Sequence, residues 1–157
     1  MPAIELAGWL DTGRQPFGDV DLSWHPEYPT ADTADTVRML QLRGDGTPPW
    51  GIWQVLHRGR VIGDIGFHGP PDDDGAVEIG YQVVPALRRR GVASTAVALI
   101  MVEAVRHGAR SIRADVVGDN RGSSRSLQCN GFRVIGEHSD TTIWGRALDP
   151  LDAARDA

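Results

Sequence analysis

Lysine is absent from this sequence. All 16 basic residues among its 157 are arginine, and 21 acidic residues outnumber them to give a formal net charge of -5. The isoelectric point is about 5.4. Proteins that bind the nucleic-acid backbone usually carry a basic face and a high isoelectric point. The charge balance therefore argues against nucleic acid as the main partner.

Cysteine and long apolar runs are also scarce. Cys129 is the only cysteine, which excludes an intrachain disulfide and a cysteine-based metal site and fits a reducing cytosol. The first ten residues lack a basic region followed by an apolar run, so we expect no signal peptide. The longest apolar stretch, VALIMVEAV, is interrupted by Glu103 and is too short to span a bilayer. We expect a cytoplasmic protein without a membrane partner or a metal.

The remaining composition, 41% hydrophobic and 24% charged, is ordinary for a globular protein. This length fits one domain with one core, so we expect a single domain over residues 1–157 with a frayed tail at 150–157. In chain order, hydrophobic periodicity and turn residues predict a short strand near 4–10, a helix over 31–42, a hairpin around Arg58 and Gly59, a strand over 76–84, a helix over 93–107, a strand over 110–117, a short helix over 123–131 and a final hairpin.

This order predicts an α/β (α+β) fold with one strand–helix–strand crossover in a largely antiparallel sheet. Asp32 or Thr33 is the expected cap of the first helix. The helix over 93–107 is apolar nearly all round, so we expect it to be buried against the sheet.

Three consecutive arginines, Arg88 to Arg90, precede Gly91 and this buried helix. A helix N-terminus carries partial positive charge, so cations there conflict with it unless an anion is present. Free backbone N–H groups at the helix start and arginine side chains can bind phosphate oxygens together. The stretch matches neither a P-loop nor the three-glycine dinucleotide fingerprint. By its spacing alone it fits a solvated loop as well as a pyrophosphate site.

Two motifs around this stretch carry a resemblance to a known family. In EIGYQVVPALRRRGVAS, Arg88, Gly91 and Ala93 match the Gln/Arg-x-x-Gly-x-Gly/Ala acetyl-CoA motif of the GNAT superfamily of N-acetyltransferases. The residues that match a second motif of the superfamily, Asn-x-x-Ser/Ala followed by Gly-Phe, are Asn120, Ser123, Gly131 and Phe132. The sequence thus resembles this superfamily over about residues 50–138, and most of all its RimJ/RimL branch.

The resemblance implies a mixed, mostly antiparallel sheet with flanking helices and a strand pair splayed by a bulge. The pantetheine arm of acetyl-CoA would lie in that gap, and its pyrophosphate against the turn into the helix. Residues 1–45 do not match obviously and would form a divergent acceptor-side region. The residues implied to bind the cosubstrate are Gln82, Val83, Val84, Arg88, Arg90, Gly91, Val92, Ala93, Ser94, Thr95, Asn120 and Ser123.

The resemblance also implies acetyl transfer to a primary amine, made directly in a ternary complex. Such a transfer needs a neutral amine, a polarised thioester carbonyl and a proton for the leaving thiolate. Glu78 and Asp115 are the candidate bases, and water without a dedicated base is the third option. Ser123 is the candidate acid, because Leu127 stands where many members have a tyrosine. Tyr81 is a poor candidate because its strand face is expected to be core.

Each of these residues also has a purely structural interpretation. Glu78 could be a surface charge at a strand edge, and Asp115 could pair with Arg113 or Arg110. Asn120 could be a turn residue before a helix, and Ser123 could cap that helix.

His68 could assist proton transfer, although a lone histidine at a strand end is more often inert. Packing is the favoured role of Trp50 and Trp53. Cys129 is expected to face the core.

Two alternative functions remain open at this point. One is an acyltransferase that uses a longer acyl-CoA, and the other is a non-catalytic acyl-CoA-binding or regulatory module, which Leu127 favours slightly. The acceptor could be a protein N-terminus, a small metabolite or an antibiotic, and the acidic balance would suit a cation. Dimers are common in the superfamily, so a homodimer is one expectation.

Overall fold

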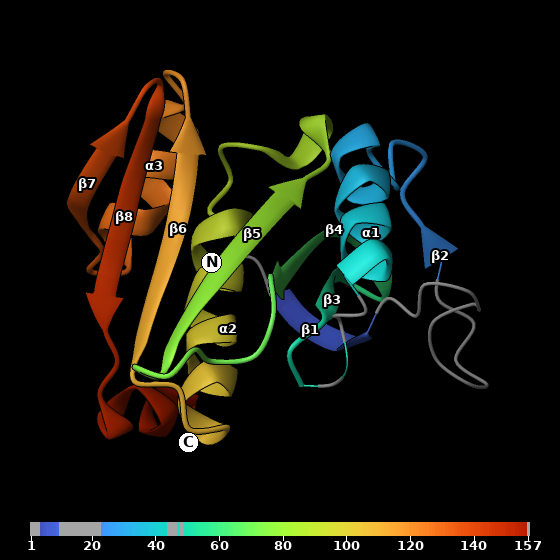
Figure 1. Ribbon diagram of the computed structural model, residues 1–157. Helices are drawn as coiled ribbons and strands as arrows, with labels where there is room; N and C mark the ends of the chain where they lie inside the picture. The colour runs from blue at the N-terminus through green and yellow to red at the C-terminus, as the bar shows by residue number, and fades with distance from the viewer. Residues whose placement is uncertain (1–3, 10–22, 44–46, 48, 157) are drawn as a thin grey trace.

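The computed structural model describes residues 4–9, 23–43, 47 and 49–156. Its strands form one sheet in the order β1-β3-β4-β5-β6-β8-β7, with the short β2 parallel to β4 (Figure 1). Most neighbouring strands are antiparallel, and β5 and β6 form the parallel pair of the crossover. The strands are β1 Ile4–Trp9, β2 Ser23–Trp24, β3 Ile52–His57, β4 Arg60–Phe67, β5 Ala76–Val83, β6 Ser111–Val117, β7 Arg133–His138 and β8 Thr141–Ala147. The predicted fold class is confirmed.

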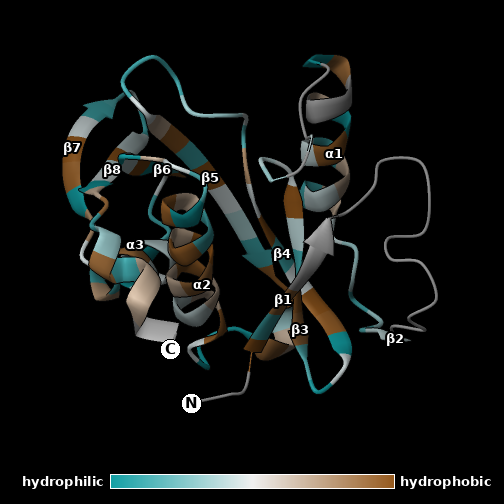
Figure 2. Cartoon of the chain, turned by 90° about the horizontal axis from the view of Figure 1, so that it is seen from below, coloured by the Kyte–Doolittle hydropathy of each residue, from teal (hydrophilic) through white to brown (hydrophobic). Residues whose placement is uncertain are grey.

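Helices cover both faces of this sheet. They are α1 Ala31–Arg43, α2 Val92–Arg106 and α3 Arg121–Cys129, with 3-10 turns η1 Pro85–Leu87 and η2 Pro150–Asp156. Figure 2 shows α1 on one side of the sheet, and α2 and α3 on the other. The prediction of a buried α2 is confirmed, because Val97, Ile100 and Ala104 on it are fully buried. None of the helices in the described part of the chain is long and apolar enough to cross a membrane.

Strands β5 and β6 pair along their first halves and then separate. Their last backbone pair joins Ile79 to Ala114, whereas β6 continues to pair with β8 as far as Val117. Figure 1 shows the two strands side by side near their starts and diverging toward their ends. Strand β5 pairs with β4 through Val83 without a register shift. The gap between β5 and β6 therefore opens without the bulge that the resemblance implies.

The helix starts differ from the predicted caps. Thr30, not Asp32 or Thr33, precedes α1, and its hydroxyl accepts a hydrogen bond from the Thr33 N–H at 3.3 Å. Helix α3 begins at Arg121 rather than near Ser123, because the side chain of Asn120 caps it. An N-cap must stand just outside the first turn, and Ser123 already lies inside it.

Two further expectations differ from the structure. The segment 150–156 forms η2 instead of fraying, because Asp152 is 4% exposed and accepts a hydrogen bond from Arg146 Nη2 at 2.8 Å. Cys129, expected to face the core, is exposed at the end of α3. The buried residue of α3 is Leu127, two positions earlier, and a helix turns by about 200° over two residues.

Candidate active site

The start of α2 has the geometry of an anion site. Gly91 adopts a left-handed φ of 78° before the helix, and a Cβ placed there would meet nothing within 4 Å. The Thr95 N–H makes the first intrahelical bond, to the Gly91 carbonyl. The preceding N–H groups of Val92, Ala93 and Ser94 therefore lack an intrahelical acceptor. Open space and unpaired donors at one place fit a phosphate group.

The three arginines before α2 are exposed but differ in their contacts. Arg88 donates from Nε to the Val83 carbonyl at 3.0 Å and so braces the end of β5. Arg89 adopts a left-handed φ of 61°, which bends the chain sharply before Gly91. Arg90 follows this bend and directly precedes Gly91 at the helix start.

Helix α3 closes the other side of the gap. Asn120 Oδ1 accepts the Ser123 N–H at 3.1 Å, and the Tyr81 hydroxyl donates to the Ser123 carbonyl at 3.1 Å. Tyr81 thus links β5 to α3; its strand face was predicted to be core, and the side chain is partly buried and packs against the core. Leu127 is fully buried in the core, so it offers no polar group where many superfamily members have a tyrosine. Asn130 ties α3 to α2, because its Nδ2 donates to the Ser94 carbonyl at 2.9 Å.

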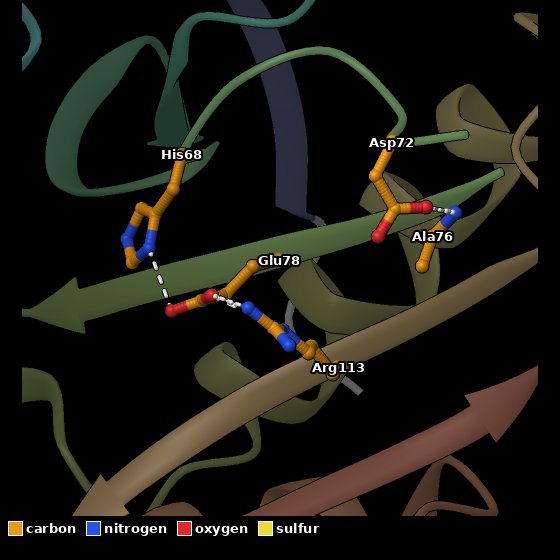
Figure 3. Close-up of polar contacts among 5 residues, drawn as sticks. All are labelled: His68, Asp72, Ala76, Glu78 and Arg113. Atoms are coloured by element: carbon orange, nitrogen blue, oxygen red, sulfur yellow. Dashed lines mark hydrogen bonds and ion pairs between the residues drawn. The ribbon is translucent and has the colours of Figure 1, made fainter. Parts of the chain in front are cut away.

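Glu78 is held between two basic side chains on the opposite face of β5 (Figure 3). Its Oε1 lies 3.0 Å from His68 Nδ1. Its Oε2 accepts two hydrogen bonds from Arg113, at 3.1 Å from Nε and 2.7 Å from Nη2. The hydrogen bond with His68, and then those with Arg113, lower the pKa of Glu78 to about 2, although partial burial opposes them. These contacts fix the position of the Glu78 carboxylate and favour its ionised form.

Asp115 has a different setting from Glu78. It lies on the exposed face of β6, two residues beyond Arg113. The structural interpretation of Asp115 was a pair with Arg113 or Arg110. Arg113 instead pairs with Glu78. The nearby Asp115 charge is a minor cause of the raised pKa of Arg113, after the hydrogen bonds and charge of Glu78.

A second polar cluster lies between α1 and the strands β4 and β5. Asp64 is 4% exposed and accepts hydrogen bonds from Thr33 Oγ1 at 2.7 Å and from Gln82 Nε2 at 3.2 Å. The Thr30 hydroxyl donates to Gln82 Oε1. Burial raises the pKa of Asp64 to about 6, although the hydrogen bonds from Thr33 and Gln82 oppose this change. The side chain of Gln82 is thus occupied by contacts with α1 and β4.

The structure brings the predicted cosubstrate residues together around one gap. The end of β5, the turn into α2 and the start of α3 meet there, as the motif order requires. The sequence analysis did not single out Asp64, the buried carboxylate beside the end of β5. The sequence feature that could have indicated it is an acidic residue inside the apolar run VIGDIGF. Such a residue is expected to be buried, and a buried carboxylate needs hydrogen-bond partners. Trp50 packs edge-on against Phe67, in agreement with the packing role favoured for it.

Comparisons with known proteins identify the class to which this fold and site belong. The model of the acetyltransferase (GNAT) domain matches residues 14–133. The chain belongs to the GNAT acetyltransferase family. The superfamily predicted from the two motifs is confirmed, whereas its RimJ/RimL branch stays a prediction.

Three similar proteins illustrate the match. The uncharacterized N-acetyltransferase YjdG of Bacillus subtilis is 25% identical over 150 residues, which cover 92% of this chain and 88% of YjdG. RimL, a ribosomal L7/L12 alpha-N-protein acetyltransferase solved with coenzyme A, has a TM-score of 0.62 at 20% identity over 76% of this chain and 73% of its own. Salmonella typhimurium yncA, solved with acetyl-CoA, has a TM-score of 0.59 at 24% identity over 76% of both chains. These two structures share the fold.

Proposed function

We propose that this protein transfers the acetyl group of acetyl-CoA to a primary amine, directly within a ternary complex. The observation that carries the proposal is the gap between β5 and β6 beyond Ile79, which lies next to the open helix start at Gly91. An extended thioester arm with a pyrophosphate at one end suits a gap with unpaired backbone groups and an anion site beside it.

The cosubstrate residues take distinct roles in this proposal. The pantetheine arm would run along Gln82, Val83 and Val84 and pair with the backbone N–H of Val83, because the Val84 N–H bonds the Ile62 carbonyl in β4 and the Val83 carbonyl already accepts from Arg88. Backbone N–H groups from the turn into α2 would bind the pyrophosphate, and Arg90 would add a charged hydrogen bond. Asn120 would contact the arm while it caps α3. The residues assigned to the pyrophosphate turn are Arg88, Arg90, Gly91, Val92, Ala93, Ser94 and Thr95.

The acceptor amine would approach from the face of β5 that carries Glu78. Figure 2 shows α2 and α3 on the opposite face, so the amine would enter from the side of the sheet on which α1 lies. Ser123 remains the proposed group near the leaving sulfur, since this residue lies half-buried at the start of α3. RimL acts on a protein N-terminus, and a protein N-terminus or a small-molecule amine is the proposed acceptor class here.

A thiol-release assay tests the proposal. The protein is incubated with acetyl-CoA and with peptides, polyamines, amino acids or aminoglycosides, and free CoA thiol is measured. We expect release that depends on one class of amine. Acetyl-CoA binding without release for any amine would favour a non-catalytic acyl-CoA-binding module, which the buried Leu127 supports. Faster release of CoA from a longer acyl-CoA would mean that the acyl donor is not acetyl-CoA, while the proposed acyl transfer to an amine would stand.

Arg90→Ala is expected to raise the KM for acetyl-CoA about tenfold and to change kcat less than about twofold. A charged hydrogen bond to a phosphate contributes about 1.5–3 kcal/mol, and 1.4 kcal/mol corresponds to tenfold in affinity. The matched control is Arg89→Ala, which removes one positive charge at the preceding residue and keeps a Cβ atom on its left-handed backbone. It should raise KM less. A loss of kcat at unchanged KM in Arg90→Ala would place the pyrophosphate elsewhere.

A further inference from the structure

Glu78 is poorly suited to accept a proton from an amine, although it lies on the acceptor side of β5. Both of its carboxylate oxygens are engaged, one by His68 and the other twice by Arg113. Its pKa is lowered to about 2. A general base works best when its pKa lies near the operating pH, so this arrangement holds a charge in place instead of supplying a proton acceptor at neutral pH.

His68 has a free ring nitrogen at the place where the gap opens. Its Nδ1 faces Glu78, which leaves Nε2 without a hydrogen-bond partner among the described residues. The ring lies over Gly80, where an added Cβ would come within 2.8 Å of Nε2. Gly80 is the first β5 residue after the last backbone pair with β6 at Ile79. The imidazole is 28% exposed, so solvent and an acceptor can reach it.

We propose that His68 is the catalytic base that takes the proton of the acceptor amine through Nε2, and that Glu78 and Arg113 are positioning residues. The proposal rests on the acetyltransferase function proposed above. The Glu78 carboxylate accepts the Nδ1–H, which fixes the tautomer whose Nε2 carries the lone pair. Arg113 holds the carboxylate from the other side, and Gly80 leaves room for the ring.

The proton balance of the step is complete with these groups. The acceptor arrives as an ammonium ion, and His68 Nε2 takes one of its protons. The neutral nitrogen then forms a bond with the thioester carbonyl carbon, and the bond from that carbon to sulfur breaks. The second proton of the attacking nitrogen goes to the thiolate and gives free CoA. The imidazolium afterwards releases its proton to solvent, so acetyl-CoA and an ammonium ion yield an amide, CoA and one proton.

Kinetics of His68→Gln test the proposal on the full-length protein. General-base catalysis contributes about 10²- to 10⁴-fold, so we expect kcat to fall by that range while the KM for acetyl-CoA stays the same. The loss should shrink at high pH and with a weakly basic analogue of the same acceptor, because such an amine is already neutral. The acid limb of the wild-type pH profile should be absent from the profile of the variant. His138→Gln on the exposed end of β7 is the matched control.

Glu78→Gln and Gly80→Ala separate positioning from proton transfer. Glu78→Gln should lower kcat less than His68→Gln does and move the acid limb, because the imidazole stays but loses its anionic partner. Gly80→Ala should lower kcat at unchanged KM for acetyl-CoA, since the new Cβ displaces the ring. A merely structural role for Glu78 would leave the position of the acid limb unchanged in Glu78→Gln.

A spectroscopic measurement does not depend on turnover. Nitrogen-15 NMR of the histidine rings should show His68 with its proton on Nδ1, and Glu78→Gln should change this tautomer balance. A proton on Nε2 in the neutral ring would overturn the proposal. Thiol release that survives unchanged in His68→Gln would overturn it while leaving the proposed function intact. A wild type that binds acetyl-CoA but acetylates no amine would instead overturn the proposed function.

Discussion

Replacing Gly63 with alanine is expected to lower the free energy of unfolding by about 3 kcal/mol, a large effect for one methyl group. Gly63 lies in β4 opposite Val83, and an added Cβ would be 2.3 Å from the Gln82 carbonyl oxygen. That oxygen belongs to the β5 backbone, so no side-chain rotation can relieve the clash. The strand would have to move where it borders the gap, so acetyl-CoA binding should weaken as well.

The control for this substitution is Gly136→Ala in β7. A Cβ at Gly136 would meet its nearest neighbour, a side-chain carbon of Ile143, at 3.6 Å, which is an ordinary contact. Urea denaturation of both variants measures the difference, and Gly136→Ala should stay within about 0.5 kcal/mol of the wild type. A Gly63→Ala protein as stable as the wild type would show that β5 can shift freely against β4.

The wild type is expected to lose stability between about pH 4 and pH 6 because of Asp64. In the unfolded chain the pKa of this carboxyl group is near its ordinary value of 3.8, whereas burial raises its pKa in the folded protein to about 6. Between these values the folded state binds more protons, so the free energy of unfolding falls as pH rises. The difference between a pKa of about 6 in the folded state and 3.8 in the unfolded state corresponds to about 3 kcal/mol of unfolding free energy. Glu78 has the opposite sign, but its window lies below pH 4.5.

Asp64→Asn isolates this contribution. The amide keeps an oxygen that can accept from Thr33 and Gln82 but carries no charge, so the variant should gain stability relative to the wild type as pH rises from 4 to 7. Denaturation curves at several pH values measure the gain. The same substitution at Asp35, exposed on α1, is the control and should leave the shape of the wild-type pH curve unchanged. Parallel curves for wild type and Asp64→Asn would mean that Asp64 does not titrate in this range.

Much of the architecture could be read from local patterns. The turn Arg58–Gly59 joins β3 to β4 as predicted, and both residues adopt left-handed φ angles, 52° and 72°. The apolar stretch before Gly108 forms α2 to within one residue of the predicted bounds. These features depend on near neighbours in the chain, because turn geometry and helix periodicity are local. The helix caps were harder to predict from the sequence, because other polar residues next to Thr30 and Asn120 are also possible N-caps.

By itself the sequence determined the family, the order of the elements and the turn into α2, because these depend on residues close together in the chain. Tertiary structure decided what the polar side chains do. Glu78 on β5 meets Arg113 on β6 and His68 just beyond the end of β4, and Asp64 meets Thr33 across the interface with α1. Spacing along one strand cannot reveal such neighbours, since strand pairing and helix packing bring them together. Glu78, one of the two carboxylates that the family resemblance offered as a base, is thereby held between an imidazole and a guanidinium.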